Sequence, residues 1–242
     1  MRTLNFAKRN LKEIIRDPLS IIFAILLPLF LLFIFQQVEI PSEAYSLENF
    51  APGTVVFGFS FITLFTAVLV AKDRGTALIT RLCAGPMKTR DYILGYTLAV
   101  LPMVLLQNVL FFAAAVLLGL EFSVGILLAI VVSVPVSVIF IMLGILIGSV
   151  TSEKSASGVS SVVVQLVAFT SGMYFSGDMI GDAFAAVCKA LPFSNCLDIV
   201  KGVLNGNYEN LLVPSIIVAA YIVVLSALTS VLFLRKLKSD NK

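Results

Sequence analysis

The sequence predicts an all-α integral membrane protein, and three observations lead to this prediction. Hydrophobic residues make up 59% of the 242 residues and charged residues only 13%, against about 45–50% and 25% in soluble domains. The mean hydropathy is +1.04. Six runs of the chain contain no charged residue, and each is long enough to cross a bilayer as a helix of ~20 residues. This composition excludes a soluble enzyme, a disordered chain and a disulfide scaffold, and a net charge of only +3 argues against nucleic-acid binding.

The charge-free runs place six transmembrane helices in one transmembrane domain over residues 18–242. The other charge-free runs are much shorter, so a seventh span is not expected. The predicted spans cover about residues 19–38, 51–71, 92–118, 124–149, 156–176 and 212–234.

Lys and Arg predict the orientation of these spans. They gather in the N-terminal segment, in the loop after the second span and in the tail, whereas the other side holds only Lys189 and Lys201. Positive charge stays on the cytoplasmic side of a membrane. We therefore expect a multi-pass protein of the bacterial cytoplasmic (inner) membrane with both termini in the cytoplasm.

Residues 1–17 have the pattern of an amphipathic helix, with apolar residues at helical spacing and basic residues on the other faces. Asp17-Pro18 ends this helix before the first span, because proline and the residue before it disfavour helix continuation. A basic amphipathic helix lies in the headgroup plane of a membrane. It can serve as an anchor, or as an elbow that braces a moving bundle.

The loop after the second span is charged at both ends and apolar in the middle. Gly75 precedes the apolar piece and Gly85-Pro86 ends it, which predicts a short helix at the cytoplasmic face. Such a helix folds back onto the bilayer or docks to a partner protein. Exposed apolar residues on a short loop favour docking.

The segment between the last two spans contains two apolar patches at helical spacing, separated by Pro192. We expect two short helices, a re-entrant pair dipping into the outer leaflet, where irregular backbone must be buried in protein or face a cavity. The alternative is a loosely packed surface loop. A turn at Pro192 would bring Cys188 and Cys196 near each other, and the sequence leaves a disulfide between them open.

Several kinds of chemistry are missing from the sequence. It contains no histidine, which removes His-based metal sites and catalytic triads. The spans contain no carboxylate of the kind that ion-coupled transporters use, and the chain has no phosphate-binding G-x-x-x-x-G-K-[ST] loop. We therefore predict no catalytic residue, no metal ligand and no cofactor bound by this chain.

Polar side chains are rare inside the predicted spans. They join neighbouring helices by hydrogen bonds, or they line a path for an amphipathic substrate. Gly144 and Gly148 form a G-x-x-x-G pattern that suits close helix packing. The candidates for a substrate path are Thr63, Thr66, Gln107, Asn108 and Gln165.

Three stretches of the sequence resemble the ABC-2 family of membrane permeases. Arg9 through Asp17-Pro18 is similar to the start of the family's domain. Asp73-Arg74-Gly75-Thr76, with Arg81-Leu82 and Pro86, is similar to its cytoplasmic coupling loop. Ser171–Ser176, with the residues that follow Leu191, is similar to its outer signature, in which the matching positions are Pro192, Asn195, Asp198 and Lys201. The family more often has His, Tyr or Arg at the position of Asn195 and Arg at that of Lys201.

The resemblance implies the membrane subunit of an ABC exporter, paired with a second copy or a sister permease. A separate P-loop ATPase subunit would bind ATP and Mg and dock on the cytoplasmic face. The implied contacts with the ATPase are Lys72, Asp73, Arg74, Gly75, Thr76, Leu78, Arg81 and Leu82. Spans without charge suggest an apolar or amphipathic cargo, such as a drug, antibiotic, lipid or lipopeptide. The alternative is a six-span channel-like or scaffold protein without an ATPase.

Overall fold

The computed structural model describes residues 2–38, 45–76, 89–174 and 181–240. Every regular element in these residues is a helix, so the all-α prediction is confirmed for the described part of the chain. The helices are α1 (Arg2–Ile15), α2 (Pro18–Gln37), α3 (Leu47–Gly75), α5 (Thr89–Leu117), α6 (Val124–Val150), α7 (Glu153–Thr170), α8 (Asp182–Ala190), α9 (Pro192–Leu204) and α10 (Leu212–Asp240).

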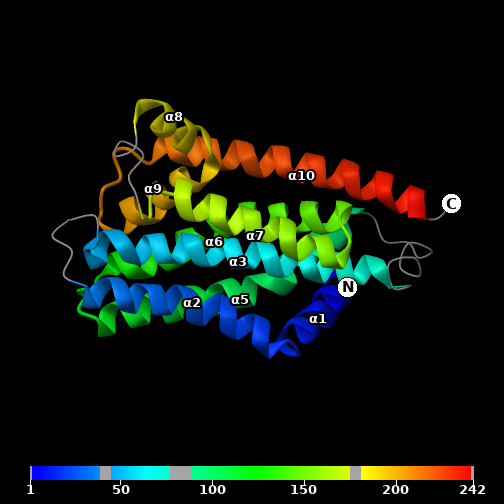
Figure 1. Cartoon of the computed structure of the whole chain (residues 1–242), viewed down its shortest axis with the longest axis horizontal. Coiled ribbons are helices and arrows are strands. Elements are labelled where there is room, and N and C mark those ends of the chain that lie inside the picture. The colour runs from blue at the N-terminus through cyan, green and yellow to red at the C-terminus, as the bar shows by residue number, and fades with distance from the viewer. Residues whose placement is uncertain (1, 39–44, 77–88, 175–180, 241–242) are drawn as a thin grey trace.

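Helix α3 lies at the centre of a bundle of helices that run side by side along the length of the molecule (Figure 1). The bundle consists of α2, α3, α5, α6, α7 and α10. Helix α3 packs against α2, α5, α6, α7 and α9. Helix α1 crosses the bundle at the end where α3 finishes, and α8 and α9 lie at the opposite end. The start of α1, the end of α3 and the end of α10 therefore share one end of the molecule.

Four of the described helices are long and apolar enough to cross a membrane: α3, α5, α6 and residues Leu212–Leu232 of α10. The pair α8–α9 is bent by 78° and is either one broken span or a re-entrant loop. The apolar part of α2, Ile21–Gln37, is too short to be counted with these four, and α7 opens with Glu153-Lys154. The six-span topology and the placement of α1 in the headgroup plane therefore stay predictions.

Several helices extend beyond or stop short of the predicted spans, and two of these departures have a clear local cause. Helix α3 continues beyond the apolar run 51–71 and takes in Lys72, Asp73 and Arg74, because side chains bind the first two charges and carbonyl oxygens at the end of α6 bind the third. Helix α7 ends at Thr170 instead of residue 176. Gly172 has φ +86°, a left-handed conformation that ends a helix and that glycine adopts without strain.

The G-x-x-x-G pattern of α6 brings this helix into close contact with α3. A Cβ added at Gly144 would lie 2.6 Å from the carbonyl oxygen of Thr63, and one at Gly148 would lie 2.5 Å from that of Ala67. A side chain would therefore push the helices apart, since real contacts are longer. The expected close packing at these two glycines is confirmed.

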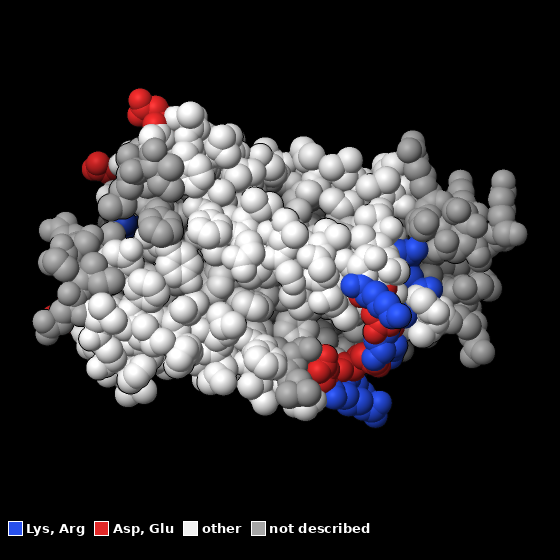
Figure 2. Space-filling model, viewed as in Figure 1, with Lys and Arg blue, Asp and Glu red and all other residues white. Residues whose placement is uncertain are grey.

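Charged side chains are confined to the two ends of the face seen in Figure 2. The middle is uncharged, and exposed apolar side chains such as Phe30 of α2, Leu106 of α5 and Val223 of α10 lie on the outside of the bundle. In water such a surface would be unfavourable, whereas hydrocarbon solvates it. The surface therefore agrees with a membrane-embedded bundle.

Candidate functional site

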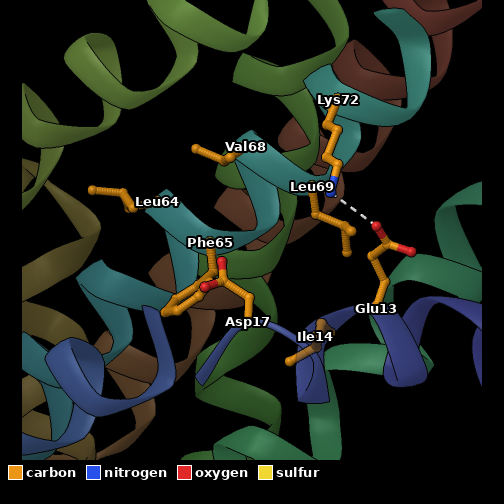
Figure 3. A pocket seen from close by; sticks show the side chains of 8 residues that line it. All are labelled: Glu13, Ile14, Asp17, Leu64, Phe65, Val68, Leu69 and Lys72. Carbon is orange, nitrogen blue, oxygen red and sulfur yellow. Dashed lines mark hydrogen bonds and ion pairs between the residues drawn. The ribbon is translucent and has the colours of Figure 1, made fainter. Parts of the chain in front are cut away.

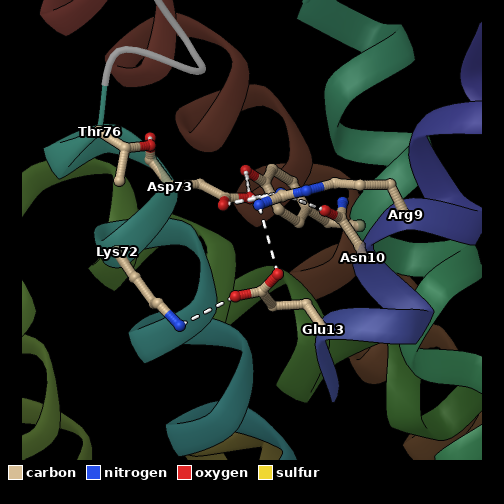
Figure 4. Close-up of polar contacts among 7 residues, drawn as sticks. Arg9, Asn10, Glu13, Lys72, Asp73 and Thr76 are labelled. Carbon is tan, nitrogen blue, oxygen red and sulfur yellow. Dashed lines mark hydrogen bonds and ion pairs between the residues drawn. The ribbon is translucent and has the colours of Figure 1, made fainter. Parts of the chain in front are cut away.

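The last turn of α3 carries a carboxylate that is held by two other helices. Asp73 is only 2% exposed. Nη1 of Arg9, from α1, donates to both of its carboxylate oxygens at 2.7 and 2.6 Å, and the hydroxyl of Tyr96, from α5, donates to Oδ2 at 2.9 Å (Figure 4). We call these three residues the Asp73 junction. A buried carboxylate requires such partners, because burying an unpaired charge is costly.

Two further charges extend the junction toward solvent. The ammonium of Lys72 binds a carboxylate oxygen of Glu13 at 2.9 Å, and Glu13 lies 3.6 Å from Arg9 (Figure 4). The hydrogen bond from Lys72 lowers the pKa of Glu13 below its ordinary value. Burial alone would lower the pKa of Arg9, but the hydrogen bond and charge of Asp73 outweigh burial and raise it. Arg9, Glu13 and Lys72 therefore keep their charges at neutral pH.

Arg74 ties α3 to the end of a fourth helix. Its Nη1 donates to the carbonyl oxygens of Gly148 and Thr151 at 3.0 and 3.2 Å. The last carbonyls of a helix have no partner within it and carry partial negative charge, so a cation is favourable there. Arg74 thus caps α6, and a cleft of about 340 Å³ opens beside it between Gly75 and Ser152.

The predicted ATPase contacts occupy different environments in the structure. Lys72, Gly75 and Thr76 are exposed, whereas Asp73 is buried and Arg74 half-buried. Thr76 donates through its hydroxyl to the carbonyl of Asp73 at 2.8 Å. Leu78, Arg81 and Leu82 lie outside the described residues, so the docking role of this set stays a prediction.

A small apolar cleft lies where α1 turns into α2 and faces the C-terminal half of α3 (Figure 3). Ile14, Phe65 and Leu69 contribute apolar side chains, and Glu13, Asp17 and Lys72 stand around it. Its volume is about 80 Å³, whereas pockets for drug-sized ligands measure ~300–1,000 Å³. It does not enclose a molecule of that size.

Four of the five substrate-path candidates are buried between helices of this one chain. Thr63 donates to the carbonyl of Phe140 at 3.0 Å, and Asn108 donates to Ser133 at 2.6 Å. Thr66 and Gln107 are also fully buried. These contacts match the helix-packing interpretation. A role on the substrate path stays a prediction for all five, and only Gln165 has the exposure that such a role needs.

Gln107 satisfies a carbonyl that a proline leaves without its helical partner. Pro28 has no N–H, so the carbonyl of Ala24, four residues earlier in α2, lacks its usual hydrogen bond. Nε2 of Gln107 lies 3.4 Å from that oxygen. Position 58 of α3 is a glycine because the Gln107 side chain occupies the space that a Cβ would need. One side chain thus connects α5, α2 and α3.

Hydrogen bonds from side chains to backbone carbonyls hold the bend between α8 and α9. Ser194 donates to the carbonyl of Cys188 at 2.6 Å. The amide of Asn195 donates to the carbonyls of Lys189 and Leu191 at 3.0 and 2.8 Å. From α10, the hydroxyl of Tyr221 donates to the carbonyl of Ala190 at 2.9 Å. These bonds satisfy the carbonyls that the end of α8 leaves free. Two short helices joined at Pro192 are therefore confirmed.

Two further signature residues, Asp198 and Lys201, lie on α9 beyond the bend. Asp198 is exposed and Lys201 is half-buried, and both line a cleft of about 250 Å³ between α9 and the start of α10. Asn195 is instead buried in the bend. Cys188 and Cys196 are buried free thiols, so they form no disulfide with each other.

Two features were not found from the sequence. The sequence places Arg9 in the predicted amphipathic helix and Tyr96 in the third predicted span, and only their contact with Asp73 in the structure reveals a further role. Helix α7 exposes Ser157, Ser161 and Gln165, spaced by four residues and hence on one face. We call these three the α7 polar stripe. Its spacing was a signal that could have been read.

Comparison with known proteins decides the family. The model of the ABC-2 type transporter family matches residues 3–205, from α1 to the end of α9. The chain belongs to the ABC-2 type transporter family. Membrane domains of this family are transport subunits that generally work with an ATP-binding subunit. A comparison with curated proteins found no match. The Asp73 junction, the α7 polar stripe and the bend all lie within the matched residues.

Proposed function

We propose that this ABC-2 protein is the membrane subunit of an ATP-driven exporter in a bacterial cytoplasmic membrane, with both termini in the cytoplasm. The family match over residues 3–205 carries the proposal. An ATPase subunit would dock at the end of the bundle that holds α1 and the end of α3. Two features of the described residues support this arrangement.

The first is the construction of the end of α3. Its last turn is bonded to α1 through Asp73, to α5 through Tyr96 and to α6 through Arg74. Thr76 directly precedes residues 77–88, the segment predicted to dock. If the ATPase moves residues 77–88, this motion reaches the bundle only through helices bonded to the end of α3. The last turn of α3 is bonded to three such helices, α1, α5 and α6.

The second is the α7 polar stripe. In a monomer surrounded by lipid, Gln165 would present an amide to hydrocarbon, which is unfavourable without hydrogen-bond partners. A second copy, or a sister permease, packed along α7 would give the stripe protein or a hydrated path as its surroundings. The small cleft of Figure 3 also supports a path completed by two chains, since one chain alone does not enclose a drug-sized molecule there.

The cargo that fits these features is apolar or amphipathic, of the class of drugs, antibiotics, lipids or lipopeptides. The α7 polar stripe offers hydroxyls and one amide, and the adjacent residues Val162 and Leu166 are apolar and exposed. Such a lining matches a molecule with a few polar groups on an apolar body.

Purification of the tagged chain from its native membrane in mild detergent tests the proposal. We expect a stoichiometric P-loop ATPase in the purified complex, and ATP hydrolysis that changes when lipophilic compounds are added. A chain that purifies alone under several gentle conditions would contradict the proposal. A chain that is inserted with its termini outside, measured by cysteine accessibility at Lys8→Cys, would contradict the orientation.

A further inference from the structure

The Asp73 junction joins three helices that are distant in the sequence. Arg9 and Asp73 are 64 residues apart, and Tyr96 and Asp73 are 23 apart. Arg9 reaches Asp73 from α1 alongside Asn10, whose Oδ1 accepts from the same Nη1 at 2.8 Å (Figure 4). One nitrogen of the guanidinium thus binds both Asn10 and Asp73, and the other, Nη2, lies 3.6 Å from Glu13.

Helix α1 is also packed tightly on α5 next to the junction. The ring of Phe6 contacts the edges of Tyr92 and Tyr96, with ring centroids 5.6 and 5.0 Å apart. Gly95 leaves the room for Phe6, since an added Cβ would lie 2.5 Å from its ring. Tyr96 therefore contacts α1 through its ring and α3 through its hydroxyl.

The junction is placed where a force on α3 would enter the bundle. Asp73 is three residues before Thr76, and the backbone N–H and hydroxyl of Thr76 both bind the carbonyl of Asp73. Its carboxylate is buried against α1 and α5, and the residue is 2% exposed. Asp73 is thus built to hold other helices of its own chain.

We propose that Arg9 and Tyr96 are positioning residues for ATP-driven coupling: they clamp Asp73 so that α1 and α5 follow the last turn of α3. This inference rests on the proposed function, because it requires an ATPase that moves residues 77–88. The junction transmits the motion to α1, and α1 passes it to α2 across Asp17-Pro18. The competing view is a junction that stabilises the fold and transmits nothing.

Hydrogen exchange measured by mass spectrometry on the complex with its ATPase separates these views without knowledge of the cargo. Peptides covering residues 77–88 and residues 2–15 are compared with and without ATP and vanadate. In the wild-type complex we expect both peptides to respond. In Arg9→Ala and Asp73→Asn complexes the response of 77–88 persists, and that of 2–15 falls by about fivefold or more, the scale of typical coupling between sites.

Two milder variants and one control make the test decisive. Tyr96→Phe removes one hydroxyl and keeps the ring, so it folds even if Arg9→Ala does not, and we expect a partial loss. Arg9→Lys keeps the charge but supplies one donor nitrogen, where Arg9 places Nη1 on Asp73 and Nη2 near Glu13, so we expect it to restore part of the response. Lys8→Ala removes an equal charge from an exposed position of the same helix and leaves the response unchanged.

The possible failures are distinguishable. A wild-type chain that binds no ATPase overturns the proposed function and the inference with it. A second outcome overturns only the inference. In that outcome the ATPase binds and residues 77–88 respond, but residues 2–15 respond equally in wild type, Tyr96→Phe and Arg9→Ala. A response of residues 2–15 that is lost in Lys8→Ala as well would also overturn it, because the effect would then follow from charge alone.

Discussion

At the scale of single residues, Gly58 and Gln107 determine each other. Alanine at position 58 would place its Cβ against the amide of Gln107 and 2.5 Å from the ring of Phe111. We expect Gly58→Ala to cost about 1–3 kcal/mol of unfolding free energy, as overpacking does. Gln107→Ala vacates most of the space, so the double variant should be more stable than the sum of the single changes predicts.

Denaturant unfolding in detergent measures the free energy of unfolding of the wild type, the two single variants and the double variant. Gly75→Ala is the control, because nothing lies within 4 Å of an added Cβ at that exposed position, and it should unfold like the wild type. Additive free energies in the Gly58–Gln107 cycle would show that the clash is absorbed elsewhere.

The ion pair of Glu13 with Lys72 should make the stability of the protein depend on pH. Its pKa is lowered in the folded protein by Lys72, so the stabilisation is present at neutral pH, above the ordinary value of 4.5, and is lost as the pH falls below 4.5 through the folded value. Because the pair is partly exposed, Glu13→Gln should cost only ~0.2–1 kcal/mol at pH 7. The difference in melting temperature from wild type should shrink at pH 4. An equal difference at both pH values would argue against the ion pair, and Glu209→Gln, at an exposed position, serves as control.

At the scale of elements, the bend between α8 and α9 depends on Asn195. Its amide donates to the carbonyls of Lys189 and Leu191, where the two helices meet. Each unsatisfied buried group costs ~1–3 kcal/mol, so Asn195→Ala should destabilise the chain by about 1–3 kcal/mol and raise hydrogen exchange in α8. The exposed Asn210→Ala should do neither. Unchanged exchange of α8 in Asn195→Ala would mean that Ser194 and Tyr221 suffice.

The elements were predictable to the extent that the bilayer dictates them. A charge-free run must be helical in hydrocarbon, since its backbone has no other partner there, and Pro192 between two amphipathic patches indicated a break. The end of α7 was predicted too late, because Gly172 adopts its left-handed conformation within an apolar run. Contacts such as Arg9 with Asp73 were out of reach, since they depend on how helices pack after they form.

At the scale of the whole molecule, the surface of α7 determines how chains associate. Glycine at position 158 lies in the exposed face of α7, next to the α7 polar stripe, and nothing in the same chain lies within 4 Å of a Cβ added there. Helix α10 is also exposed, but it presents apolar residues such as Val224, which suit lipid. A pairing of two copies would therefore use α7 and not α10.

Gly158→Phe tests this pairing without loading the fold of one chain. The ring would point away from the bundle, so the stability of the isolated chain should stay within about 0.5 kcal/mol of wild type, as for surface changes generally. If α7 faces a second copy, the ring enters the interface, and native mass spectrometry in detergent should show the pair replaced by single chains. Val224→Phe adds the same ring to α10 and should leave the pair intact. A pair that survives Gly158→Phe and is lost in Val224→Phe would place the interface on α10, and the α7 polar stripe would then need another explanation for facing outward.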